Sequence, residues 1–337
     1  MSDIAFNELL EPFGRLLADV SSLTQVRAVE AGASVTNLWA ALHESGFVDA
    51  MVSEARGGAG LSLAEAGPLV QALGRHLVPV PFAQSMVARA LLAAAGVERP
   101  EGSIVLISPT THGGGYRQHA VSQAQVANYA LVDLGDHTIL TSLSDAAVDA
   151  TGIHASRAAD VSWQSSPHAL ATIATPKGGL RPIAAVLRAA EISGAVDRVL
   201  DMTIAYACER VQFGKPIGKQ QAIQQQLAVM AEQTVMARMA AQIGCAYGLP
   251  PPPNAAAVAK QVASTAVTAI VATAHAVHGA IGISEEYDLQ LFVRRLHEWR
   301  MADGTESYWA GHLGRARLAS YTASSVEFVR LGVSSVG

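Results

Sequence analysis

Cysteine, aromatic and charged residues are all scarce in this sequence of 337 residues. The two cysteines, Cys208 and Cys245, are too few for a disulfide framework or a cysteine-rich metal site. Only 15% of the residues are charged and the formal net charge is −5, with no basic cluster, so a nucleic-acid-binding protein is excluded. So few charged residues on a chain of this length favour a protein that buries part of its surface against other subunits.

A long, strongly hydrophobic run is also missing. The longest uncharged segment, 261–284, is rich in Ala, Thr and Gly, which predicts a buried bundle helix and no membrane span. Residues 1–23 alternate acidic and apolar residues and lack the layout of a signal peptide. A reduced, cytoplasmic location is therefore expected.

Alanine supplies much of the hydrophobic half of the composition, which indicates a mostly α protein because alanine is the best helix former. Helical patterns fill residues 1–100 and return from 178 to 337, which predicts two helical domains. Between them, residues 101–177 contain short β-type runs at 104–107, 129–132 and 138–141 that are separated by turns. We expect a small β domain there, with its last strand ending by about Trp163 and a linker at 177–179.

Local signals refine this division. Ser62 followed by Glu65 is typical of a capping box, and the glycine-rich loop before it is expected to connect helices, since no strand precedes it. The glycines at 113–115 predict a flexible loop between strands. Glu191 lies near an apolar helical stripe and is expected at its solvent-facing edge. Four or five helices with short turns after residue 181 predict a bundle.

One stretch, Arg210 to Lys219, crowds charge, an aromatic residue, two glycines and a proline into ten positions. Glycine and proline restrict the backbone there, which predicts a turn of fixed shape between two helices. The planar guanidinium of Arg210 suits phosphate or carboxylate groups. The structural alternative is a salt bridge buried in the helix turn.

The segments 209–217 and 275–287 resemble the signature of the acyl-CoA dehydrogenase family in order, spacing and residue type. Residues 54–65 and 294–305 are also similar to the family, so the resemblance covers most of the chain except 101–177. It implies an N-terminal helical domain, a shortened middle β domain and a C-terminal four-helix bundle. It also implies FAD-dependent α,β-desaturation of an acyl-CoA thioester, in which a carboxylate removes a proton and the flavin accepts hydride.

The resemblance implies roles for particular residues, and the cofactor-binding ones are Arg210, Gln212, Phe213, Gly279, Ala280 and Thr305. The first three would reach the pyrophosphate and adenosine of an FAD held mainly by a neighbouring subunit, and the others would line the same region. Asp303 occupies the position of the catalytic glutamate, one methylene shorter, and a helix-capping role is its alternative. In members with the base on an earlier helix, the counterpart is Ala184, which cannot act.

Two departures point to a particular subgroup. The family's flavin-ring loop has no equivalent, since 108–113 carries neither the acid nor the spacing, and a nucleotide-contacting glutamine is replaced by Ala276. The chain is thus similar to the degenerate subunit of α2β2 heterotetrameric acyl-CoA dehydrogenases of steroid side-chain degradation. It would complete the FAD pocket of a homologous catalytic chain. The alternatives are a homotetrameric dehydrogenase that uses Asp303 as base, and a structural subunit without flavin contact.

Overall fold

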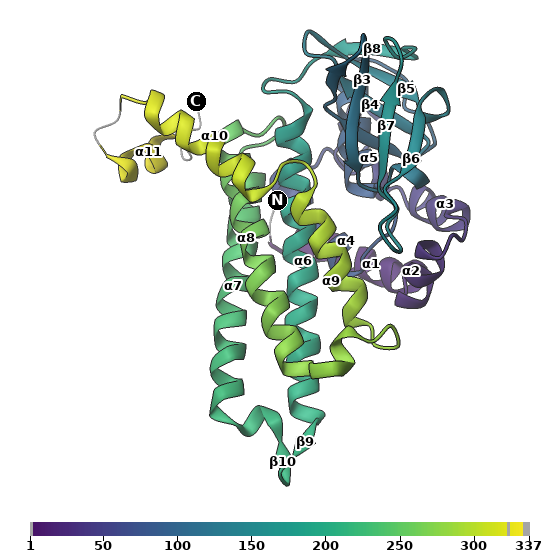
Figure 1. The fold of residues 1–337 in the computed structure, drawn as a ribbon. Helices are drawn as coiled ribbons and strands as arrows, with labels where there is room; N and C mark the ends of the chain where they lie inside the picture. Colours follow the sequence, from purple (N-terminus) through teal and green to yellow (C-terminus); the bar gives the residue numbers. More distant parts are fainter. Residues whose placement is uncertain (1–2, 322–323, 333–337) are drawn as a thin grey trace.

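The computed structural model describes residues 3–321 and 324–332, and it is mostly helical with a small β domain (Figure 1). The predicted fold class is confirmed. The N-terminal region is built of short helices that lie beside the bundle and beneath the β domain. They are α1 (Asp3–Val20), α2 (Leu23–Glu30), α3 (Thr36–Glu44), α4 (Leu63–Arg75) and α5 (Phe82–Ala94).

The start of α4 shows why the sequence signal there was readable. The hydroxyl of Ser62 accepts a hydrogen bond from the backbone N–H of Glu65 at 3.3 Å, and the Glu65 carboxylate accepts one from the backbone N–H of Ser62 at 2.8 Å. This reciprocal capping box satisfies two amides that the helix itself cannot. The predicted capping box is therefore confirmed, and the glycine-rich loop before it connects N-terminal elements.

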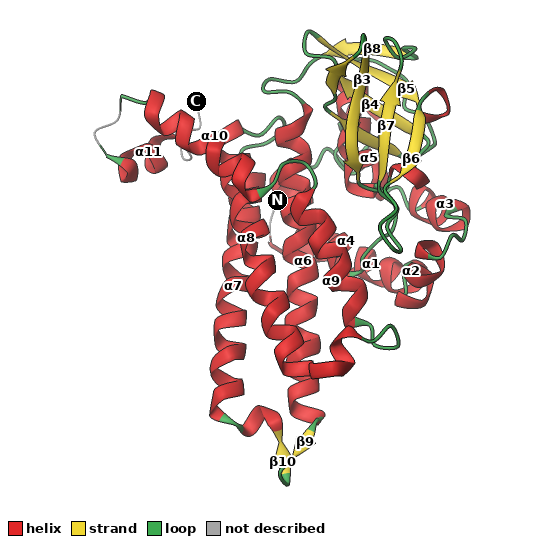
Figure 2. Ribbon diagram, in the orientation of Figure 1, coloured by secondary structure: helices red, strands yellow, loops and turns green. Residues whose placement is uncertain are grey.

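The β domain consists of two four-stranded sheets (Figure 2). The first has the order β1-β4-β5-β8 with β1 and β4 parallel, and the second has the order β2-β3-β7-β6 and is antiparallel. The strands are β1 (Ile104–Ile107), β2 (Thr110–His112), β3 (Gly115–Val121), β4 (Tyr129–Asp133), β5 (His137–Ser142), β6 (Ala147–Ala150), β7 (Ala159–Trp163) and β8 (Ala171–Ala174).

One expectation about the β domain was wrong. The β structure continues past Trp163, because β8 pairs with β5 even though its sequence, Ala-Thr-Ile-Ala, carries almost no strand signal. The loop between strands that was predicted at 113–115 is present: Gly113 and Gly114 form the turn between the paired strands β2 and β3 with positive φ angles of 57° and 85°, and Gly115 begins β3. Pairing between distant segments decides the formation of β8.

The C-terminal helices form the predicted bundle. Its three long members are α6 (Leu180–Glu209), α7 (Gln221–Cys245) and α8 (Pro253–His278), and the shorter α9 (Leu289–Met301), α10 (Glu306–Ala319) and α11 (Ser325–Gly332) follow. The segment Pro253–Ile283 is long and apolar enough to cross a membrane by length and composition alone, which the sequence reading had not expected. Because α8 packs against α6, α7, α9 and α10, its apolar composition is that of a core helix.

Candidate functional site

The Arg210 stretch is an exposed hairpin at the far end of the bundle from the β domain (Figure 1). It follows α6 directly and contains the short strands β9 (Val211–Gln212) and β10 (Lys215–Pro216). Its shape is held by a 2.8 Å hydrogen bond from the backbone N–H of Ile217 to the carbonyl of Arg210. Phe213 at the tip has a φ of 52° and its residue surface is 93% exposed.

The charged group at the base of this hairpin has no partner within the described chain. Arg210 is exposed, and none of the described carboxylates lies within ion-pairing distance of its guanidinium. The alternative of a buried salt bridge in the helix turn is therefore wrong. An unpaired guanidinium beside a wholly exposed aromatic ring is an arrangement suited to an external anionic group with a ring system.

The turn after α8 lies at the same end of the bundle as this hairpin (Figure 1). It forms a short helix, η6 (Gly279–Ile283), in which Gly279 and Ala280 are exposed. The Tyr206 ring on α6 stacks on the His278 ring with centroids 4.4 Å apart, and Val277 shares a small buried cluster with Ala207 of α6 and Ile217, which follows the hairpin. Five of the predicted cofactor-binding residues, Arg210, Gln212, Phe213, Gly279 and Ala280, therefore lie at the same end of the bundle.

His278 is a member of this site that the sequence reasoning did not single out. Its Nδ1–H donates to the carbonyl of Ala274 at 2.8 Å, which leaves Nε2 as an acceptor, buried and without a partner among the described residues. Burial lowers the pKa of His278, and neighbouring His275 adds to this effect, so the ring is neutral at pH 7. The motif includes His278, but nothing in the sequence indicates that its side chain is buried.

Thr305 does not join the other predicted cofactor-binding residues. It caps α10, where its hydroxyl accepts from the backbone N–H of Tyr308 at 3.1 Å. The neighbouring Gly304 carbonyl accepts a 3.0 Å hydrogen bond from Lys260, early in α8, whereas His278 ends that helix. At the rise of an α-helix, the span from Lys260 to His278 is about 27 Å. Within one chain, Thr305 and the Arg210 hairpin thus belong to different regions.

Asp303, the candidate base, is held in a buried ion-pair cluster. One of its carboxylate oxygens lies 3.0 Å from Nε of Arg188, and the Asp303 side chain is only 9% exposed. Nη1 of Arg188 pairs with Glu191 at 2.6 Å, and its guanidinium lies over the Trp299 ring, 5.4 Å from the centroid. A carboxylate that is enclosed and engaged by a buried guanidinium is not open to a substrate proton.

The cluster corrects two expectations. Asp303 is no helix cap, because Thr305 fills that position, and its own φ of 58° places it in a strained turn. Glu191 lies in the core and not at the solvent-facing edge of the helical stripe, since its residue surface is 6% exposed. Burial raises the pKa of Glu191, and Arg188 offsets only part of that effect. The sequence did not show that the Arg188 guanidinium pairs with both Glu191 and Asp303.

Lys260 on α8 forms hydrogen bonds to the backbone on both sides of Asp303. Its side chain is fully buried, and Nζ lies 2.8 Å from the Ser264 hydroxyl, 2.9 Å from the carbonyl of Arg300 and 3.0 Å from that of Gly304. Burial lowers the pKa of Lys260 to about 7. A neutral amine can keep all three contacts, because the Ser264 hydroxyl can donate to its lone pair.

Lys260 predicts a pH-dependent part of the stability. Its folded-state pKa of about 7 lies below the value of 10.5 in the unfolded chain, so between these two values the unfolded chain binds more protons. The free energy of unfolding should therefore rise with pH from about 7 to 10.5 through this residue. Urea unfolding across that range should show a flatter pH profile for Lys260→Met than for the wild type. If the unfolding free energies of the wild type and of Lys260→Met rose equally with pH, the low pKa of Lys260 would be contradicted.

The comparisons with known proteins address the family. The pattern of the acyl-CoA dehydrogenase C-terminal domain matches residues 183–318. Acyl-CoA dehydrogenase IpdE2 of Mycolicibacterium smegmatis is 33% identical over 270 residues, which cover 77% of this chain and 81% of that protein. The chain belongs to the acyl-CoA dehydrogenase family. The resemblance predicted from the two C-terminal motifs is thus confirmed, and the family's members are oxidoreductases that act on CH–CH groups.

Solved acyl-CoA dehydrogenase structures share the fold over almost the whole chain. The ChsE4-ChsE5 complex from Mycobacterium tuberculosis has a TM-score of 0.82 at 22% identity and covers 96% of this chain and 99% of that chain. The steroid acyl-CoA dehydrogenase Tcur3481-Tcur3483 has a TM-score of 0.79 at 23% identity and covers 94% and 99%. At these identities the likeness is one of fold.

The family generally binds FAD, and the hairpin end of the bundle fits the nucleotide half of that cofactor. The unpaired Arg210 guanidinium suits a pyrophosphate, and exposed Phe213 offers a ring face. The enclosed Nε2 of His278 is a further polar atom without a partner among the described residues. When bound, FAD supplies the hydride acceptor, and these residues would hold and orient its nucleotide.

Proposed function

We propose that this chain is a subunit of an FAD-dependent acyl-CoA dehydrogenase that completes the nucleotide pocket of a homologous catalytic chain. The observation that carries this proposal is the exposed hairpin with the unpaired Arg210 and the Phe213 ring, at the same end of the bundle as the Gly279 turn. These groups point away from their own core, so the cofactor that they would contact lies mainly in another chain. Gln212 is exposed beside them and can add a hydrogen bond.

The state of Asp303 supports a non-catalytic role for this chain. A working base needs access to the substrate and a carboxylate that is free to take a proton. The Asp303 carboxylate is instead enclosed and paired with Arg188. Ala184, at the alternative position for the base, is buried in α6 and carries no titratable group. The alternative of a self-sufficient dehydrogenase using Asp303 is therefore disfavoured.

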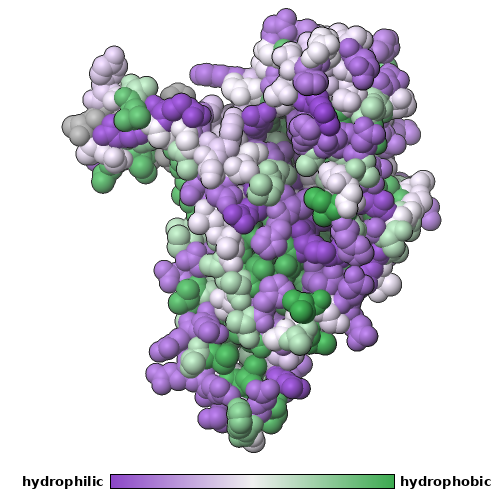
Figure 3. All heavy atoms as spheres, viewed as in Figure 1, coloured by the Kyte–Doolittle hydropathy of each residue, from purple (hydrophilic) through white to green (hydrophobic). Residues whose placement is uncertain are grey.

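The bundle carries an apolar face that suits the partner. Large hydrophobic side chains are exposed along α7 and at the end of α6, and the residues are Ile204, Val229, Val235, Met236, Met239 and Ile243. Hydrophobic residues also gather over the lower half of the bundle in the face shown in Figure 3. An exposed apolar surface of this kind is typical of a protein–protein interface. A homologous catalytic chain, in an α2β2 assembly, is the proposed occupant.

A steroid-derived acyl-CoA thioester is the proposed substrate of the assembly. This part rests on the similarity of the fold to a steroid acyl-CoA dehydrogenase and to the two-component ChsE4-ChsE5 complex. The substrate would bind and react in the catalytic partner, since the candidate base of this chain is unavailable.

Flavin content tests the role of Arg210. The chain should be co-expressed with a homologous catalytic acyl-CoA dehydrogenase chain, and FAD should be released from the purified complex and quantified against protein. We expect one FAD per two chains for the wild type and a loss of at least tenfold in FAD affinity for Arg210→Ala, because a charge-assisted contact to phosphate is removed. Lys219→Ala removes an exposed positive charge from the same segment and serves as the control.

The other two interpretations give different results in the same experiment. An FAD affinity of the complex that is unchanged by Arg210→Ala would leave a structural subunit without flavin contact. A chain that is yellow when purified alone, and that reduces a dye with an acyl-CoA, would be a self-sufficient dehydrogenase. In that case Asp303→Asn should abolish its activity.

A further inference from the structure

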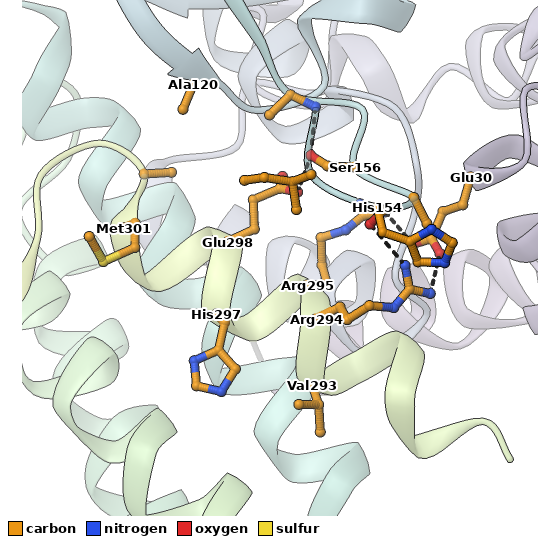
Figure 4. Close-up of a pocket in the computed structure, with 14 residues that line it drawn as sticks. Glu30, Ala120, His154, Ser156, Val293, Arg294, Arg295, His297, Glu298 and Met301 are labelled. Atoms are coloured by element: carbon orange, nitrogen blue, oxygen red, sulfur yellow. Dashed lines mark hydrogen bonds and ion pairs between the residues drawn. The ribbon is translucent and has the colours of Figure 1, made fainter. Parts of the chain in front are cut away.

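A pocket of about 340 Å³ lies between the loop that precedes β7 and the outer side of α9 (Figure 4). Most of its wall is apolar, and the apolar residues are Ala120, Ile153, Ala155, Ala158, Val293, Met301 and Ala302. Ile153 and Met301 are 62% and 60% exposed, so two large hydrophobic side chains face solvent at this site. The volume is in the range of small-molecule sites.

Glu298 supplies an unusual charge in this apolar wall. Its two carboxylate oxygens accept hydrogen bonds from the hydroxyls of Ser122 at 2.9 Å and Ser156 at 2.7 Å, both of which belong to the β domain. Among the described residues, none of the cationic groups lies within ion-pairing distance of Glu298. Each carboxylate oxygen can accept two hydrogen bonds, so Glu298 retains acceptor capacity after both serines are counted.

The neighbouring cations are already engaged. Arg294 and Arg295 both pair with the buried Glu30, at 2.9 and 2.8 Å. The Arg295 guanidinium also lies 5.9 Å from the centroid of the Trp299 ring, and its Nη1 is enclosed without an acceptor. Burial, with Arg300 and His275, lowers the pKa of His297, so this imidazole is neutral at pH 7. On the remaining side, His154 lies 3.2 Å from Glu285.

We propose that this pocket binds a compact, neutral, mostly apolar ligand whose hydroxyl group donates to Glu298. The formal charges at the site, two arginines against Glu30 and Glu298, cancel. An anionic ligand would meet the Glu298 carboxylate, whose charge is not paired. A cationic ligand would lie beside the partly exposed Arg294, in a cluster where two arginines share the single carboxylate of Glu30 and therefore keep a net positive charge. A hydroxyl avoids both repulsions, and its apolar body is matched by the alanines and by Met301.

The site is independent of the proposed nucleotide contact. The pocket faces the β domain, whereas the Arg210 hairpin lies at the other end of the bundle (Figure 1). Loss of flavin binding on changing Arg210 would leave this ligand site untouched, and loss of the ligand site would leave the flavin content of a complex unchanged.

Three small probes of the same shape test the proposal. Cyclohexanol, cyclohexylammonium and cyclohexanecarboxylate should be titrated into the full-length chain with ¹³C-methyl-labelled methionine, and the Met301 signal, assigned with Met301→Leu, should be followed. We expect saturable shifts with cyclohexanol and binding at least about tenfold weaker for both charged probes. Glu298→Ala should weaken cyclohexanol binding by about tenfold or more, because a hydrogen bond to a charged acceptor is lost.

Two further variants keep the outcome decisive. Ile153→Asp places a charge at an exposed wall residue, so it should fold normally and abolish the cyclohexanol shift. Glu232→Gln, an exposed change on α7, should have no effect on binding. Equal binding of all three probes, or cyclohexanol binding that Glu298→Ala leaves unchanged, would overturn the proposal. The absence of any saturable shift in the wild type would overturn it as well.

Discussion

Replacing Arg188 by methionine should lower the free energy of unfolding by about 3–5 kcal/mol at pH 7.5. The guanidinium is 1% exposed and pairs with both Glu191 and Asp303. Methionine fills much of the same volume but removes the ion-pair partner of both Glu191 and Asp303, and breaking a buried pair from one side costs far more than the pair contributed. Urea unfolding, followed by circular dichroism, measures the change.

The loss should depend on pH in a defined direction. Burial raises the pKa of Glu191, so the folded chain holds its proton more tightly than the unfolded chain does. The stability from such a group is present below the unfolded pKa and is lost as pH rises through the folded one. Without Arg188 the folded pKa of Glu191 moves further up, and the deficit of Arg188→Met should therefore be smaller at pH 5.5 than at pH 7.5.

An exposed arginine provides the control. Arg15 pairs with Glu11 one helical turn away, and the two side chains are 69% and 74% exposed. Arg15→Met should change the free energy of unfolding by no more than about 0.5 kcal/mol, because such surface pairs contribute little. Similar losses for Arg188→Met and Arg15→Met would mean that the buried cluster adds nothing beyond an ordinary surface pair. If Arg188→Met lost more unfolding free energy at pH 5.5 than at pH 7.5, the raised pKa of Glu191 would not be the cause of the pH dependence.

The features that the sequence predicted depend on contacts between nearby residues, and the features that it missed depend on contacts between distant ones. The capping box of Ser62 and Glu65 spans three residues, and the Arg210 turn is set by its own glycines and proline, so local sequence predicts both. The strand β8 forms only because β5 lies beside it, and its sequence carries no signal of that partner. Register and pairing between distant segments are the part that a single sequence hides.

The candidate site divides in the same way. The motifs predicted that Arg210 and Gly279 line one region, and both residues lie in turns at the same end of the bundle. They did not reveal that Thr305 lies at the other end, since that requires the direction of α8 and the contact between Lys260 and Gly304. The partner of Asp303 was hidden for the same reason, because 115 residues separate it from Arg188.

Replacing Gly194 by alanine should destabilise the chain by about 3 kcal/mol or more, and it should lower the yield of folded protein. At this position α6 crosses α4 so closely that a Cβ atom would lie 1.8 Å from the backbone oxygen of Gln71. The reciprocal contact occurs at Gly74 of α4, where a Cβ would lie 1.9 Å from the Glu191 oxygen. Because both obstacles are backbone atoms, no side-chain rotation can relieve them, and the helices must separate.

The same substitution on an open helical surface should have the opposite sign. Gly314 lies within α10 and has no atom within 4 Å of an added Cβ. Gly314→Ala should therefore stabilise the chain by about 0.5–1 kcal/mol through helix propensity alone. Thermal unfolding of the two variants measures the contrast.

Because Glu191 sits at the α4–α6 crossing, separating the helices would admit water to its carboxylate and lower the cost of leaving it without Arg188, so Gly194→Ala and Arg188→Met should be less than additive. Additive losses would show that the crossing and the ion-pair cluster are independent.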